Sequence, residues 1–375
     1  RTTMAGRRIY LAGSSGYPNY GDEIVAAHWL RYLAKHEPDA EVWLDSPNPG
    51  GATLLFGDLH PNVRFVDTLF RIAWAAPSEE PDEVVDFASQ AVRQLGFGVP
   101  HRALGIELLH NIDVFHVIGG AYINAIWPRH LALLAAGGVV AQEFGGRAAV
   151  TGAGLVPAAG SGKLLDGLAE RYAVFDVRDE ASAALVSGGN VSESGDDALL
   201  DLGEAVYDSR ESRSVMMCFQ SDQLDSDVEA LAESARATAV AWGVDGEKIG
   251  YVEGIPGQDR IVFDLISEAL PGMRFYPFTE VWREGMPARR GQRWLTTRSD
   301  VHLVAAAAGA WGVAFPTKAG YTDVAHQDLV RRGSRWAIGT PGEVAPEVYG
   351  EAGFGRSVEA QVTAKQAVAR AVYGH

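Results

Sequence analysis

Two adjacent carboxylates, Asp22 and Glu23, open a helical segment and are suited to take a proton from a substrate hydroxyl. They belong to a Gly-rich turn that contains Asn19 and Gly21. The turn follows the apolar run Arg8–Ala12, a pattern that predicts a buried parallel strand. The residue types and their order therefore predict a proton-transfer site at a strand–helix turn.

The elements that would position these carboxylates are the strand before them and the helix after them. Apolar residues at helical spacing predict a helix over 24–36. In open α/β sheets polar ligands bind beyond the carboxyl ends of strands, beside the amides and positive dipole of the following helix. Adjacent side chains on a helix diverge, so one substrate engages one of the two acids. We favour Asp22 as the base because it lies nearer the loop, and a capped turn without a ligand is the alternative.

Two later stretches offer further groups for binding and proton transfer. Gly119 and Gly120 end an apolar strand pattern, and glycines there let backbone approach a ligand closely or simply permit a tight turn. His302 opens a helix of small apolar residues, where an imidazole can donate a proton near neutral pH or can be a core residue. Arg298 lies just before it.

Cations near His302 would suit an anionic substrate. Arg293, Arg298 and Lys318 are close to it in sequence, and charged donors of this kind hold carboxylates and phosphates. A solvated loop lysine is the alternative for Lys318.

Composition narrows the classes of partner. The net charge of −16 argues against nucleic acid and against electrostatic adhesion to an anionic membrane. The single cysteine, Cys218, excludes an internal disulfide, and no metal-ligand spacing is present, so we expect neither a metal nor a cofactor. With no signal-peptide pattern and no apolar run of transmembrane length, we expect a cytoplasmic protein.

Short apolar runs alternate with helical stretches in both halves of the chain. This alternation predicts an α/β protein with two doubly wound parallel sheets. The composition turns polar and charged after residue 208, so we place an N-terminal domain at 1–208 and a second at 209–350. The helical stretch within 351–375 is expected to pack back on the first domain. Asn48-Pro49-Gly50-Gly51 predicts a polar loop.

Four motifs keep an order that resembles the polysaccharide pyruvyl transferase family. They are Asn19-x-Gly-Asp-Glu, the diglycine at 119–120, Arg178-Asp-x-x-Ser, and the stretch that ends in His302. The resemblance implies two Rossmann-like domains facing a cleft, the arrangement called GT-B. It also implies transfer of a pyruvyl group from phosphoenolpyruvate to hydroxyls of a saccharide as a ketal, in the synthesis of cell-surface polysaccharide or glycolipid.

The resemblance also implies roles for the residues above. Asp22 would be the general base and His302 the general acid; phosphoenolpyruvate would be a substrate and not a cofactor. The donor would be held by Arg298, Lys318 and Arg293, and the acceptor side of the cleft would be lined by Asn19, Gly21, Glu23, Gly119 and Gly120. The expected partners are a saccharide or lipid-linked saccharide and a second copy of the chain.

Two departures from the family pattern keep other functions open. Asp300 and Gln220 stand where arginines are expected, and an aspartate repels an anionic donor unless a base pairs with it. One alternative is a GT-B glycosyltransferase that uses a nucleotide sugar, with Glu280 or Asp300 holding the ribose. The other is a saccharide-binding homologue without catalysis.

Overall fold

A computed structural model describes residues 6–348 and 353–374 and divides the chain into two compact units. The first unit holds the residues up to Tyr17, the segment Asp22–Leu200, and the chain from Thr363 onward. The second unit holds Pro18–Gly21 and Asp201–Val362. The division between Leu200 and Asp201 lies a few residues before the boundary that composition predicts, at residue 208. A short piece of the turn after the first strand, Pro18–Gly21, is assigned to the second unit.

The first unit is built on a seven-stranded parallel sheet, and its strand order identifies a doubly wound fold. Across the sheet the strands are β3 (Val63–Val66), β2 (Glu41–Asp45), β1 (Arg8–Ala12), β4 (Val114–Val117), β5 (Arg147–Ala153), β6 (Val174–Val177) and β7 (Val191–Glu193). Strand order reverses between β1 and β4, which are direct neighbours. Ligands bind at such switch points because the loops on either side diverge there.

The second unit repeats this design with six parallel strands. Across the sheet they are β10 (Arg274–Tyr276), β9 (Ile249–Val252), β8 (Val215–Cys218), β11 (Arg293–Thr296), β12 (Trp311–Ala314) and β13 (Ala337–Ile338). Its switch point lies between β8 and β11. The prediction of an α/β protein with two doubly wound sheets is confirmed.

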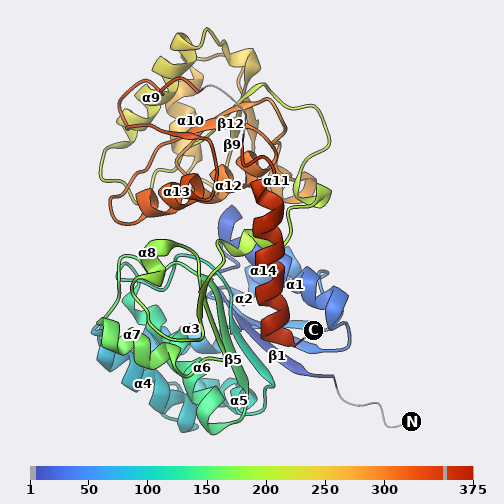
Figure 1. The fold of residues 1–375 in the computed structure, drawn as a ribbon, viewed down its shortest axis with the longest axis vertical. Coiled ribbons are helices and arrows are strands. Elements are labelled where there is room, and N and C mark those ends of the chain that lie inside the picture. Colours follow the sequence, from blue (N-terminus) through green and yellow to red (C-terminus); the bar gives the residue numbers. More distant parts are fainter. Residues whose placement is uncertain (1–5, 349–352, 375) are drawn as a thin grey trace. The chain divides into compact units, whose positions relative to one another are not determined.

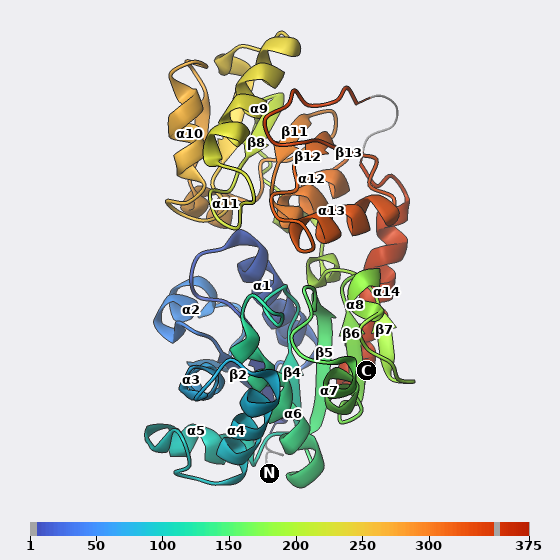
Figure 2. The same ribbon diagram turned by 90° about the vertical axis from the view of Figure 1, so that its left-hand side faces the viewer.

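Helices cover both faces of each sheet. Their bounds are α1 (Tyr20–His36), α2 (Pro49–Phe56), α3 (Thr68–Ala75), α4 (Pro81–Arg93), α5 (Ala103–Leu109), α6 (Leu131–Glu143), α7 (Gly162–Ala169), α8 (Glu180–Ala183), α9 (Val228–Ala241), α10 (Arg260–Ser267), α11 (Phe278–Glu284), α12 (Ser299–Ala307), α13 (Thr322–Arg331) and α14 (Ser357–Tyr373). In the first unit α3, α4, α6 and α7 lie on one side of the sheet, with α1 and the end of α14 on the other (Figure 1). In the second, α9 and α10 pack on one face and α12 contacts the other (Figure 2).

Successive side chains along the strands point to opposite faces of the sheet, and both faces are buried under helices. Tyr10, Phe115 and Phe175 point into the core beneath α3, α4 and α6, and all three are fully buried. His116, next to Phe115, points to the opposite face, where its ring meets Trp29 of α1 edge-on at 4.5 Å. Strands buried on both faces are apolar without strict alternation, which is why the runs in the sequence predict them.

Helix starts differ from the sequence prediction in two places. Helix α1 begins at Tyr20, so Asp22 and Glu23 lie in its first turn rather than before it. The predicted loop around Asn48 is wrong, because α2 begins at Pro49. The Asn48 side chain accepts a hydrogen bond from Gly51 N, and proline at the first helical position has no N–H to satisfy.

Asp45, at the end of β2, should make stability depend on pH. Burial raises its pKa to about 7, although Leu69 N and the Tyr10 hydroxyl donate to Oδ2. The folded state thus holds this proton more tightly than the unfolded chain, so the free energy of unfolding should fall as pH rises from about 4 to 7, by roughly 4 kcal/mol. Urea denaturation across this range should show a flatter profile for Asp45→Asn. The exposed Asp58→Asn is the control, and parallel profiles for Asp45→Asn and the parent protein would refute the prediction.

Candidate active site

The carboxyl edge of the first sheet brings Asp22 and Gly120 together across the switch point between β1 and β4. A Cβ atom added to Gly120 would lie 3.3 Å from Asp22 Oδ1 and 2.6 Å from the Tyr122 ring. Gly120 has φ +146, a region that favours glycine. Burial, and then the charge of Asp22, raise the pKa of Tyr122. Asp22 is therefore a half-buried carboxylate at the sheet edge where ligands of this fold bind.

Glu23 is hydrogen-bonded to the loop that follows β1. Its side chain is fully buried, and both carboxylate oxygens accept from Gly16 N, at 2.9 and 3.1 Å. These bonds fold the turn after β1 back onto the first turn of α1. Of the two adjacent acids, Glu23 is bonded to the loop at Gly16 and Asp22 lies beside Gly120.

Gly119 is held against a buried acidic residue, Asp197. Its N–H donates to Asp197 Oδ2 at 2.8 Å, and a Cβ atom would lie 2.7 Å from Asp197 Cγ. The same oxygen accepts from Trp29 Nε1 at 2.7 Å and from Thr151 Oγ1 at 2.6 Å. Close packing on this carboxylate explains why glycine follows β4.

Lys365, on α14, balances the charge beneath this edge and was not predicted. Its ammonium is fully buried and donates to Asp197 Oδ1 at 2.9 Å, Asp176 Oδ2 at 3.0 Å and the Gly195 carbonyl at 2.7 Å. The sequence offers no local signal for these contacts, because the partners lie 168 and 189 residues away. Through these two carboxylates the lysine stabilises the loop after β4, the end of β5 and the loop after β7.

Asn19 and Gly21 lie in the second unit, where the turn meets Asp300. Tyr20 N donates to the Gly254 carbonyl at 3.0 Å. A Cβ atom on Gly21 would lie 3.0 Å from Asp300 Cγ. Only glycine lets this turn approach the first turn of α12 so closely.

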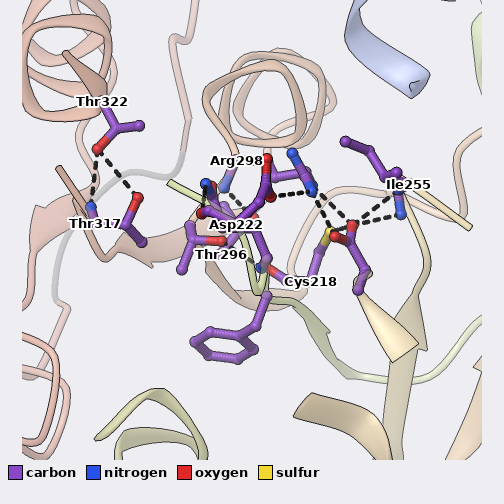
Figure 3. A network of polar contacts seen from close by, with 12 residues as sticks. Cys218, Asp222, Ile255, Thr296, Arg298, Thr317 and Thr322 are labelled. Carbon is purple, nitrogen blue, oxygen red and sulfur yellow. Dashed lines mark hydrogen bonds and ion pairs between the residues drawn. The ribbon is translucent and has the colours of Figure 1, made fainter. Parts of the chain in front are cut away.

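Arg298, at the carboxyl end of β11, is held in a buried ion pair. Its Nε donates to Asp259 Oδ2 at 2.7 Å, its Nη2 donates to Asp259 Oδ1, and Nη2 lies 3.3 Å from Asp222 Oδ1. Figure 3 shows Arg298 beside Asp222, with Cys218 and Ile255 next to the pair. Two carboxylates thus offset the guanidinium charge. Arg298 lies at the carboxyl edge of the second sheet, but because its charge is offset it brings little net positive charge to an anionic donor.

Lys318 and Arg293 lie at opposite edges of the second sheet. Lys318 follows β12 in a turn fixed by Thr322, whose Oγ1 accepts from Thr317 N at 2.9 Å (Figure 3) and from Lys318 N at 2.8 Å. Within the described part of the chain the Lys318 ammonium has no ion pair or hydrogen bond. Arg293 begins β11 and stacks over Trp242 at 4.6 Å. The prediction that Arg293 joins Lys318 and Arg298 is therefore wrong, because the strand carries it to the amino edge.

His302 is enclosed inside the second unit. Its Nδ1 lies 3.0 Å from His326 Nδ1, its Nε2 lies 2.6 Å from Ser334 Oγ, and its ring stacks on Trp336. His326 Nε2 must donate to the Thr297 carbonyl at 2.8 Å, so a neutral His326 accepts from His302 Nδ1–H. Burial, and then the neighbouring His326, hold the pKa of His302 well below its usual value.

This environment does not suit the predicted general acid. The imidazole is neutral, both nitrogens are bonded inside the unit, and the side chain has no exposed surface. A general acid must carry a proton and reach its substrate. His302 is better interpreted as a core residue. Through His326 it fixes the loop at Thr297 and Arg298.

Two further predicted groups are engaged by neighbours. Gln220 donates through its side chain to the Asp222 carbonyl, and its N–H donates to Thr297 Oγ1, both at 2.8 Å. Glu280 pairs with Arg274 at 2.7 Å and with Arg210 at 3.0 Å. The carboxylate of Glu280 is thus neutralised, which disfavours the ribose contact considered for a glycosyltransferase.

Two other features bear on the predictions. Across residues 6–348 and 353–374, no three His, Cys, Asp or Glu side chains are grouped so that they could hold a metal ion. None of the helices in these segments is long and apolar enough to cross a membrane.

The chain has two doubly wound parallel sheets in succession, as the GT-B fold does. Solved structures agree with this fold. MnaA of S. aureus in complex with UDP has a TM-score of 0.53 at 12% identity, covering 97% of this chain and 87% of that one. UDP-GlcNAc 2-epimerase of Neisseria meningitidis bound to UDP-GlcNAc has a TM-score of 0.51 at 8% identity, covering 98% and 100%.

The family follows from the sequence itself. The family model for polysaccharide pyruvyl transferases matches residues 19–249, and the chain belongs to this family of transferases. The match begins at Asn19, the first residue of the turn that carries Asp22. A comparison with curated proteins found no match.

Proposed function

We propose that the protein transfers a pyruvyl group from phosphoenolpyruvate to hydroxyls of a saccharide, forming a ketal. The observation that carries the proposal is the position of Asp22 beside Gly120, at the switch point of the first sheet. The family match, which begins in this turn, supports the reaction type.

Asp22 acts as the general base in this proposal. Its carboxylate accepts the proton of an acceptor hydroxyl as the oxygen attacks the enol carbon that bears the phosphate. Solvent supplies a proton to the terminal carbon of the enol, which completes the methyl group. A second hydroxyl then replaces the phosphate on the same carbon and closes the ketal, and the proton of this hydroxyl leaves with the phosphate. The glycine backbone beside Asp22 lets the Tyr122 ring pack close to this carboxylate.

Lys318 is the donor-binding cation in this proposal. Its ammonium follows β12 and has no charged partner in the described chain, whereas Arg298 is balanced by Asp259 and Asp222. A phosphate or carboxylate of phosphoenolpyruvate would supply the missing counter-charge. His302 acts as a positioning residue, because its bond to His326 fixes the loop that carries Arg298.

Calorimetric titration with phosphoenolpyruvate tests the donor, with uridine diphosphate as the comparison. We expect saturable binding of phosphoenolpyruvate that Lys318→Ala weakens by roughly 10- to 100-fold, the effect of losing one charged hydrogen bond. Lys163→Ala, which removes an exposed lysine of the first unit, is the matched control and should bind normally. Arg298→Ala is a poor probe because it would leave Asp259 buried without its counter-charge.

The other outcomes separate the alternative functions. Binding of uridine diphosphate alone would indicate a glycosyltransferase that uses nucleotide sugars. Binding of neither compound, with retained binding of a saccharide, would indicate a homologue without catalysis. Phosphoenolpyruvate binding that Lys318→Ala leaves unchanged would remove Lys318 from the donor site.

A further inference from the structure

A groove of about 1110 Å³ opens at the amino edge of the second sheet, away from the loops described above. It lies where the chain enters β11 and β12 and where α14 begins, and its walls include Trp311, Phe354 and Ser357. Arg298 and Lys318 follow the carboxyl ends of the same strands. A four-residue strand spans about 13 Å, so the groove is separate from the proposed donor site.

Three arginines line this groove. They are Arg290, Arg335 and Arg356, all exposed, and no carboxylate is among the lining residues in the described chain. Arg290 and Arg356 have no ion pair with any described residue. Within a protein of net charge −16, the groove therefore gathers three arginine side chains in one concave place. Such a concentration attracts anions more strongly than a scattered surface charge does.

Local packing builds this groove. A Cβ atom on Gly309 would lie 3.3 Å from Arg290 Cγ, so the stem of Arg290 lies across this glycine. A Cβ atom on Gly333 would lie 2.9 Å from Ser357 Oγ, which draws the start of α14 against the loop before β13. The positive end of a 17-residue helix therefore adds to the arginines.

We propose that this groove binds the phosphate group of a phosphorylated saccharide. A guanidinium group can bind two phosphate oxygens at once. The half-buried Trp311 in the lining is an aromatic side chain on which a sugar can pack. The volume greatly exceeds what a lone phosphate fills and is at the upper end of small-molecule sites. The phosphate can come from a free sugar phosphate or from a lipid that carries it. The inference does not depend on the pyruvyl transfer proposed above.

Titration with glucose 1-phosphate tests the free ligand. We expect saturable binding that the triple variant Arg290→Ala/Arg335→Ala/Arg356→Ala weakens at least tenfold. The control triple variant Arg31→Ala/Arg283→Ala/Lys163→Ala removes the same charge from exposed positions elsewhere and should bind normally. Lys318→Ala should also bind normally, which separates the groove from the proposed donor site. Trp311→Ala should weaken binding of glucose 1-phosphate more than binding of inorganic phosphate.

Co-sedimentation with vesicles tests the lipid-borne source. Binding to phosphatidylglycerol vesicles but not to phosphatidylcholine vesicles, lost in the groove variant alone, would assign the phosphate to a lipid headgroup. Binding of glucose 1-phosphate without vesicle binding would assign it to a free ligand. The proposal is overturned if neither probe binds, or if the groove and control variants bind alike.

Discussion

Replacing Lys365 with methionine is expected to lower the free energy of unfolding by about 3–5 kcal/mol, the range measured when one partner of a buried ion pair is removed. The substitution keeps much of the side chain's volume but leaves Asp176 and Asp197 buried without the ammonium that they share. Chemical denaturation at neutral pH, followed by circular dichroism, measures the loss.

The pH dependence of this contribution follows from the shifted groups. Burial alone would lower the pKa of Lys365, but Asp197 and Asp176 outweigh it and raise that pKa. Burial alone would raise the pKa of Asp197, but Lys365 and the Thr151 hydroxyl outweigh it and lower that pKa. The pair therefore stabilises the fold between the usual carboxyl and lysine values and weakens outside them. Lys35→Met, at an exposed position, is the control. If Lys365→Met lowers the free energy of unfolding by less than about 1 kcal/mol, the prediction is contradicted.

Asp22→Asn is expected to lower kcat by about 10²- to 10⁴-fold, the contribution typical of a general base. Asparagine has nearly the same shape, and Asp22 is half-buried at the sheet edge, so the melting temperature should change little. Phosphate release from phosphoenolpyruvate in the presence of a saccharide acceptor measures the rate.

Glu23→Gln provides the matched comparison for Asp22→Asn. Glu23 holds the loop at Gly16, so its substitution should lower stability and affect kcat much less than the neighbouring change does. Near-normal turnover in Asp22→Asn would remove this residue from the mechanism. Equal losses of kcat in both variants would indicate that the turn as a whole, and not one carboxylate, determines the rate.

Strands and the turn at Asp22 could be predicted because their signals are local. Apolar runs ending in glycine mark β1 and β4, and neighbouring strands in a doubly wound sheet place Asp22 and Gly120 at one edge. The ion pairs that offset buried charges could not be predicted in the same way, because their partners lie far apart in the sequence. Arg298 pairs with Asp259, which lies 39 residues away in the sequence. The closeness of Arg298 to His302 in the sequence suggested that its charge was available to the donor, but this ion pair offsets that charge.

Short distances in sequence also misled the assignment of cations to the donor site. Arg293 and Arg298 are five positions apart, but an extended strand rises more than 3 Å per residue, so they occupy opposite edges of the sheet. The position of His302 in the sequence was misleading in the same way. Its place near the start of α12 suggested access to a ligand, whereas packing against His326 and Trp336 encloses it.

The position of Lys365 on α14, after all the strands of the second unit, has a consequence for synthesis on the ribosome. The sheet of the first unit is complete at β7, yet its buried cation is translated about 170 residues later. Domains usually fold as they emerge, N-terminal first. Here the nascent first unit must wait for α14, with Asp176 and Asp197 still uncompensated. Emergence of α14 from the ribosome, rather than emergence of β7, should therefore mark the moment when the first unit becomes resistant to protease.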